Sequence, residues 1–140
     1  MENKSSALAI FFIRSLLGII FFWQGYGKVF NWGLSNVYNS TFKSFEELGL
    51  SEWFLKLVLY FTSFAELIVG MLLILGLFRK WAYFLIISLL LIVAFGHGLQ
   101  EGIWNLSHVF YRAALLLPLL LLPFHHDKYC LDVYLKKKSE

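Results

Sequence analysis

Four long apolar runs dominate the chain, and most polar residues lie between them. The runs cover residues 7–29, 54–77, 81–99 and 103–124. A helix needs about 20 apolar residues to cross the hydrocarbon core, and backbone groups in lipid must be hydrogen-bonded within the chain. Each run is therefore predicted to be a membrane-spanning helix. Arg14 within the first run, with no small-x-small cleavage pattern, argues against a cleaved signal peptide.

The links between the runs predict how the helices are connected. The second and third runs are joined by only Phe78-Arg79-Lys80, and "QEGIWN" joins the third to the fourth. Short links predict antiparallel neighbours, so the fold class is all-α: an integral membrane antiparallel four-helix bundle. The bundle is expected to form one domain over residues 1–140, with a basic tail at 125–140.

The link between the first two runs is long and has a pattern of its own. Its apolar residues recur at roughly helical spacing, which predicts an amphipathic segment lying on the membrane surface. A solvated, loosely ordered loop is the alternative. The residues that carry the pattern are Val37, Phe42, Phe45 and Leu48.

Composition supports a membrane protein and excludes several other classes. Hydrophobic residues make up 59% and charged residues 15%, against about 45–50% and about 25% in soluble domains. The net charge is +3, but the basic residues cluster at the ends of apolar runs, where they suit anionic headgroups rather than nucleic acid. Cys130 is the only cysteine, which excludes an internal disulfide or a CxxC redox pair.

Basic residues between the runs predict the orientation, because cytoplasmic loops are enriched in lysine and arginine. One side of the membrane receives Lys4, Arg79, Lys80, Lys128, Lys136, Lys137 and Lys138, and the other receives Lys28, Lys43 and Lys56. This excess predicts a multi-pass protein of the inner (cytoplasmic) membrane with both termini in the cytoplasm.

Ionisable residues inside the runs are costly, at about 2.5–3.5 kcal/mol each near the membrane centre, so they are expected to face the bundle and pair. At about 100° per residue, Arg14 and Lys28 share one face of the first helix with two glycines that allow close packing. Lys28 either reaches outward to headgroups or caps the polar interior. The predicted polar core comprises Arg14, Gly18, Gly25, Lys28, Glu66, Gly70, His108 and Arg112.

Glu66, near the middle of the second run, is the acidic member of this core. We hypothesise that it is ionised and bridges to Arg14 or to Arg112, since either long side chain can reach it. A purely structural ion pair that fixes helix register and a functional group are both compatible with the pattern.

Two sets of residues invite a ligand. Glu66, His97 and His108 are candidates for ligand binding or proton relay, although interfacial polar residues that satisfy one another are the favoured interpretation. Haem is disfavoured because no ligand spacing is distinctive. Past the last run, four potential ligands lie within six residues, but a closed metal site usually takes ligands from two elements. We predict no metal site there and a surface polar cap formed by His125, His126, Asp127 and Cys130.

The stretches "FIRSLLGIIFFWQGYGK", "FAELIVGMLLILGLFRKWA" and "KYCLD" together resemble the DoxX family of small four-helix membrane proteins over about residues 10–132. That family typically has an arginine, glycines and a Gly-x-x-Lys pattern in its first span, matched here by Arg14, Gly18, Gly25 and Lys28. Its second-span pattern is matched by Ala65, Glu66, Leu67, Gly70, Leu75, Gly76, Leu77 and Arg79. The family often ends with a "GxGxxSLD" segment. Of this segment the present chain retains only Leu131-Asp132, and "HHDKYC" stands in place of the rest.

The resemblance implies a function without specifying a reaction. The family is linked to quinone-coupled thiosulfate oxidation, and its members occur beside redox enzymes. This implies a non-autonomous membrane subunit of a quinone-linked redox complex, an oxidoreductase component if it takes part in the chemistry. Its expected partners are the lipid bilayer and another membrane or redox protein or a second copy of the chain. A quinone is a compatible cofactor. A non-catalytic assembly factor or chaperone is the alternative, and a small-molecule or proton transporter is a third.

Overall fold

The computed structural model describes residues 2–101 and 106–139, and these residues form helices and short connections without a strand. The helices are as follows: α1 (Glu2–Tyr26), η1 (Gly27–Trp32), α2 (Leu34–Val37), η2 (Tyr38–Phe42), η3 (Lys43–Glu46), α3 (Glu52–Leu75), α4 (Arg79–Glu101), α5 (Ser107–Leu121), η5 (Phe124–His126) and α6 (Leu131–Ser139). The predicted all-α class is therefore confirmed.

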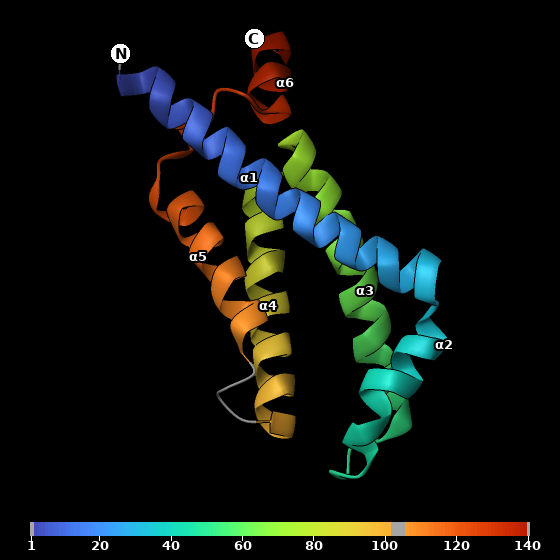
Figure 1. Ribbon diagram of the computed structural model, residues 1–140. Helices are drawn as coiled ribbons and strands as arrows, with labels where there is room; N and C mark the ends of the chain where they lie inside the picture. Colours follow the sequence, from blue (N-terminus) through green and yellow to red (C-terminus); the bar gives the residue numbers. More distant parts are fainter. Residues whose placement is uncertain (1, 102–105, 140) are drawn as a thin grey trace.

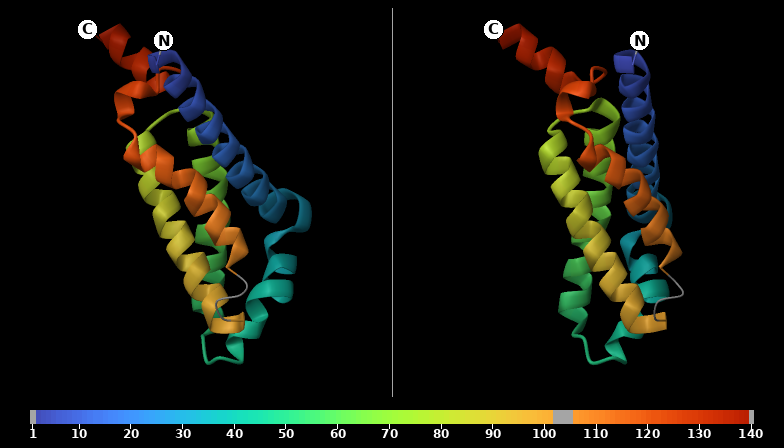
Figure 2. Two further views of the ribbon diagram at one scale, coloured as in Figure 1. Left: turned by 60° about the vertical axis from the view of Figure 1, so that its left-hand side comes forward. Right: turned by 90° about the vertical axis from the view of Figure 1, so that its left-hand side faces the viewer.

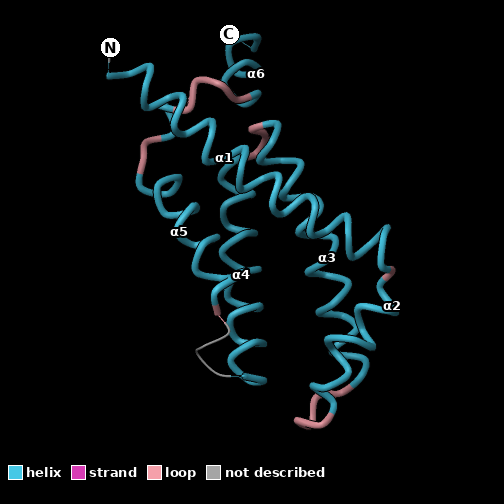
Figure 3. The backbone as a smooth tube through the Cα atoms, viewed as in Figure 1, coloured by secondary structure: helices cyan, strands magenta, loops and turns pink. Residues whose placement is uncertain are grey.

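Helices α1, α3, α4 and α5 alternate in direction and lie side by side (Figures 1 and 2). Their main contacts follow a cycle in which α1 packs on α3, α3 on α4, α4 on α5 and α5 on α1. The N-terminus, the α3–α4 turn and α6 lie at the same end of the molecule, which we call the terminal end. The segment from η1 to η3 and the start of α5 lie toward the opposite end, and loops occupy only short stretches of the trace (Figure 3).

Three helices are long and apolar enough to cross a membrane, over Lys4–Trp32, Glu52–Leu75 and Arg79–Glu101. The predicted fourth span, 103–124, is shorter than expected. Its helix α5 has 15 residues, or about 22 Å at 1.5 Å per residue, against about 30 Å of hydrocarbon. It ends because Leu122 is extended, as the residue before a proline prefers. Residues 102–105 lie outside the described part of the chain.

Glycines set the distance between α1 and α3. A Cβ atom added to Gly70 would lie 2.4 Å from the Phe22 backbone nitrogen, and one added to Gly25 would lie 2.4 Å from that of Leu67. Both contacts are too short for any other residue. The two backbones therefore meet directly, as small residues permit in membrane helices.

The link between α1 and α3 is folded onto the first half of α3. Its short helices bury Val37, Tyr38 and Phe45 against Leu55 and Leu59. Of the four residues that carried the predicted pattern, Val37, Phe42 and Phe45 thus pack against protein, whereas Leu48 is 53% exposed. A loosely ordered loop is not what the structure shows. Its position on the membrane surface stays a prediction.

Large apolar side chains cover the outer faces of the long helices. Phe12, Phe84 and Leu91 are each more than 60% exposed. Exposed apolar surface of this extent fits a lipid bilayer rather than water.

Candidate functional site

Charged and polar side chains that are buried or partly buried gather in two places between the helices. The terminal cluster, at the terminal end, consists of Arg14, Arg79, Asp127 and Asp132. The inner cluster, farther along α1 and α3, consists of Gln24, Lys28, Glu66 and Arg112.

Arg14 is the centre of the terminal cluster and is completely buried. Its Nε lies 3.0 Å from Asp127 Oδ2, and its Nη2 donates to the Tyr129 carbonyl at 2.6 Å. Its Nη1 donates to the carbonyls of Leu73 and Ile74, which lie at the C-terminus of α3. A cation there adds a donor to the last carbonyls of the helix, of which that of Leu73 also accepts the Gly76 N–H, and it complements the negative end of the helix dipole.

Gly76 makes this contact between Arg14 and α3 feasible. The Leu77 N–H donates to the Leu72 carbonyl at 2.9 Å, and Gly76 adopts the left-handed conformation with φ of 69°, which only glycine adopts readily. A Cβ atom on Gly76 would lie 2.5 Å from Cys130 Cβ and 3.0 Å from Arg14 Nη1. The turn therefore needs glycine for both its backbone angle and its neighbours.

Asp127 and Asp132 complete the terminal cluster. Asp127, only 2% exposed, also receives Arg79 Nη1 at 3.1 Å. Asp132 Oδ2 lies 3.3 Å from Arg79 Nε, and its carboxylate accepts the backbone N–H groups of Phe78 and Arg79 at 3.0 and 3.2 Å. The cluster thus pairs two guanidinium groups with two carboxylates, and it ties the C-terminal segment to three helices.

The predicted surface cap at 125–130 is wrong for two of its four residues. Asp127 and Cys130 are buried, because the chain after α5 folds back under α1 and the α3–α4 turn. Burial also raises the pKa of the Cys130 thiol. His125 is exposed and His126 half-buried. The sequence signal that could have found this pair is Arg14 itself, a charge in the first half of an apolar run that needs a carboxylate at the same end of the molecule.

The inner cluster is built on the Glu66 carboxylate, which is 1% exposed. Lys28 Nζ lies 2.8 Å from Oε2 and 3.0 Å from Oε1, and the lysine side chain is 19% exposed. Lys28 therefore caps the polar interior rather than extending to headgroups.

The predicted partners of Glu66, Arg14 or Arg112, were wrong. Arg14 contacts α3 at Leu73, seven residues beyond Glu66 and thus about 10 Å away along the helix. Arg112 donates a hydrogen bond from Nη2 to Gln24 Oε1 instead.

Arg112 is 6% exposed and lacks an ionic partner of its own among the described residues. Its guanidinium carbon lies 5.5 Å from the centre of the Phe21 ring and 5.2 Å from that of Tyr111, at cation–π distance. Its buried Nε has no hydrogen-bond acceptor in the described part of the chain. The inner cluster thus holds two cations against one carboxylate.

The remaining predicted site residues lie elsewhere. His108 is exposed on α5 with its ring 6.2 Å from Tyr111, so this chain does not enclose it in the predicted core. His97 is half-buried near the end of α4. Gly18, Gly25 and Gly70 lie at the α1–α3 contact. Within residues 2–101 and 106–139, no three His, Cys, Asp or Glu side chains are placed to hold a metal ion.

The fold and the two clusters define a small helical membrane protein whose long helices are joined by buried ion pairs. The chain belongs to the DoxX family, whose profile matches residues 9–98. This match includes Arg14, Lys28, Glu66 and Arg79, but Arg112 and both aspartates of the terminal cluster lie beyond it. Searches of curated proteins and of solved structures found no match.

Proposed function

We propose that this protein is a non-autonomous membrane subunit of a quinone-linked redox complex. It lies in the inner membrane as an antiparallel four-helix bundle, and α5 together with its flanking residues makes the fourth crossing. Lys80 and Lys128 at the terminal end support a cytoplasmic location for that end and for both termini.

The observation that carries this proposal is the charge imbalance of the inner cluster. An unbalanced cation buried among membrane helices is costly, and Arg112 Nε is a buried donor that lacks an acceptor among the described residues. A neutral carbonyl oxygen satisfies such a donor without adding a second buried charge. The residues present therefore fit the carbonyl end of a quinone.

This chain's own residues would bind and orient the quinone. Arg112 and Lys28 are the hydrogen-bond donors toward a carbonyl oxygen, and Glu66 is the group at which a proton can be held. Phe21, which is buried, and Tyr111 border the guanidinium. When bound, the quinone supplies two-electron redox chemistry that no side chain of this protein can provide.

Lipid extraction followed by mass spectrometry tests the proposal directly. We expect the purified full-length protein to carry about one quinone per chain. Arg112→Gln should reduce this content about tenfold or more, because the amide replaces a charge-assisted donor. Lys43→Gln, at an exposed position outside the cluster, is the control and should retain the quinone.

Two outcomes would contradict this assignment. One is a wild-type protein without quinone when extracted in mild detergent. The other is an Arg112→Gln protein with the wild-type melting temperature and undiminished quinone content. Lys28→Gln provides a second test of quinone content. Lys28 is partly exposed, and its replacement leaves the terminal cluster intact.

A second candidate function, docking of a partner protein, is favoured by α6. This helix extends away from the bundle at the terminal end (Figure 2). Its Val133, Tyr134 and Leu135 are 40%, 71% and 55% exposed, beside Lys136 and Lys137. In-cell crosslinking from Tyr134 distinguishes the candidates: a stoichiometric partner with no bound quinone supports an assembly factor, whereas a partner together with bound quinone supports the redox subunit.

A further inference from the structure

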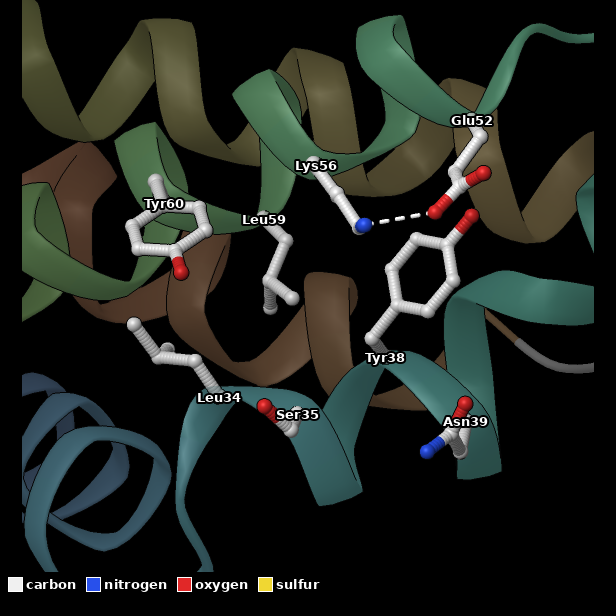
Figure 4. Close-up of a pocket in the computed structure, with 8 residues that line it drawn as sticks. All are labelled: Leu34, Ser35, Tyr38, Asn39, Glu52, Lys56, Leu59 and Tyr60. Carbon is white, nitrogen blue, oxygen red and sulfur yellow. Dashed lines mark hydrogen bonds and ion pairs between the residues drawn. The ribbon is translucent and has the colours of Figure 1, made fainter.

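A cavity of about 240 Å³ lies between the folded link and the first turns of α3, away from both charged clusters. Ser35 and Asn39 line one wall, and Glu52, Lys56 and Tyr60 line the other (Figure 4). The cavity is smaller than the roughly 300–1,000 Å³ of sites for drug-sized ligands. It therefore suits a small polar group rather than a complete cofactor.

The walls of the cavity offer both signs of charge. Lys56 Nζ lies 2.5 Å from Glu52 Oε1, and the two side chains are 52% and 59% exposed. An ion pair between exposed side chains one helical turn apart contributes little stability. The two side chains can therefore separate, and each can bind a ligand group of opposite charge. A zwitterion satisfies both groups at once.

The surroundings favour a primary ammonium over a quaternary one. Lys56 Nζ already lies 5.5 Å from the centre of the Tyr38 ring, and the Tyr38 hydroxyl donates to Glu46 at 2.5 Å. The ring face of Tyr38 is thus in contact with Lys56, and its hydroxyl is bonded to Glu46. Apart from Tyr60, the groups of the cavity that remain for a cation are the oxygens of Glu52, Ser35 and Asn39, which suit an ammonium that donates hydrogen bonds.

The position of the cavity indicates the source of the zwitterion. It lies at the beginning of α3, one of the helices long enough to cross the membrane. Trp53, in the first turn of α3, is 73% exposed, and tryptophan is enriched where membrane helices meet the headgroups. Leu34 and Leu59 form an apolar side of the cavity. The acyl chains of a lipid whose headgroup occupies the cavity can lie against this side.

We propose that this cavity binds the phosphoethanolamine headgroup of a membrane phospholipid, with Lys56 on the phosphate and Glu52 on the ammonium. The proposal is independent of the quinone-linked function, because the cavity shares no residue with the inner cluster.

Native mass spectrometry of the full-length protein tests this site. With equal amounts of dioleoyl lipids, we expect phosphatidylethanolamine to be retained about tenfold more than phosphatidylglycerol, which lacks the ammonium, or phosphatidylcholine, whose ammonium cannot donate. The double variant Glu52→Gln/Lys56→Gln should lose this preference.

The matched control is Lys43→Gln/Glu47→Gln, a second exposed pair with the same spacing that does not line the cavity. It should keep the preference. Equal retention of the three lipids by the wild-type protein overturns the proposal, as does an unchanged preference in the Glu52→Gln/Lys56→Gln protein. Complete displacement of the lipid by an equal concentration of free phosphoethanolamine would show a soluble ligand and overturn the lipid assignment.

Discussion

The terminal cluster and the inner cluster use the same kinds of side chain but differ in charge balance. In the terminal cluster, two arginines meet two aspartates, and the Asp127 carboxylate is shared by both guanidinium groups. In the inner cluster, Lys28 pairs with Glu66, whereas Arg112 hydrogen-bonds to the neutral side chain of Gln24. A balanced, enclosed network fixes the positions of helices, whereas a cluster with one more cation than carboxylate has capacity left for a ligand. Charge balance thus separates the structural cluster from the functional candidate.

The largest expected effect comes from Asp127→Asn, which removes one charge and almost no volume. Two buried guanidinium groups then lose their shared carboxylate, and removing one partner of a buried pair typically destabilises by about 3–5 kcal/mol. Thermal unfolding in detergent micelles should show a large drop in melting temperature. Asp132→Asn is the comparison; its side chain is 27% exposed, and a smaller drop is expected. Equal melting temperatures for wild type and Asp127→Asn would remove the structural role assigned to this cluster.

Glu66→Gln tests the inner cluster in the same way and should have a smaller effect, of about 1–3 kcal/mol. Lys28 is partly exposed and can reach water when its partner is lost. The double variant Lys28→Gln/Glu66→Gln should recover at least half of the loss, since two amides can hydrogen-bond to each other. A double-mutant cycle on melting temperatures measures this coupling. Additive effects of the two single changes would show that the pair does not hold α1 to α3.

Gly70→Ala tests the backbone contact that lies between the two clusters along α3. The added methyl group meets the Phe22 backbone, so the helices must separate, at about 1–3 kcal/mol for an overpacked site. Gly27→Ala is the control, because a Cβ atom there meets nothing within 4 Å. Melting temperatures of the two variants should differ clearly; an equal change in both would contradict the close approach.

The smallest effect concerns Cys130, beside the terminal cluster. Burial raises the pKa of its thiol above the usual 9.0, so the folded state holds the proton more tightly than the unfolded state. Its contribution to stability is complete below about pH 9 and is lost as pH rises from there through the folded pKa, by at most about 1.4 kcal/mol per pH unit. Unfolding measured from pH 8 to 10 should show this slope, and Cys130→Ala should reduce it. A slope that Cys130→Ala leaves unchanged would assign the pH dependence to other groups.

Local patterns predicted much of the fold and part of each cluster. The faces of α1 and α3 followed from helical periodicity, so Arg14, Gly25, Lys28, Glu66 and Gly70 all lie where those helices meet. Helical periodicity wrongly placed His108 in the polar core. It shares a face of α5 with Arg112, but it lies one turn nearer the start of the helix, where that face is exposed. The pattern also failed for Asp127, whose burial depends on how the chain folds back after Pro123.

The sequence by itself determined that this is a helical membrane protein, where three of the helices long enough to cross lie, and which of their faces are polar. These properties depend on the length and period of runs of neighbouring residues. Only the tertiary structure decided which charges pair. Lys28 and Glu66 are 38 positions apart, and Arg14 and Tyr129 are 115 apart. The choice of partner depends on helix depth, crossing and the path of the C-terminal segment, because the attraction between two charges depends on their distance in space and not on their separation in the chain.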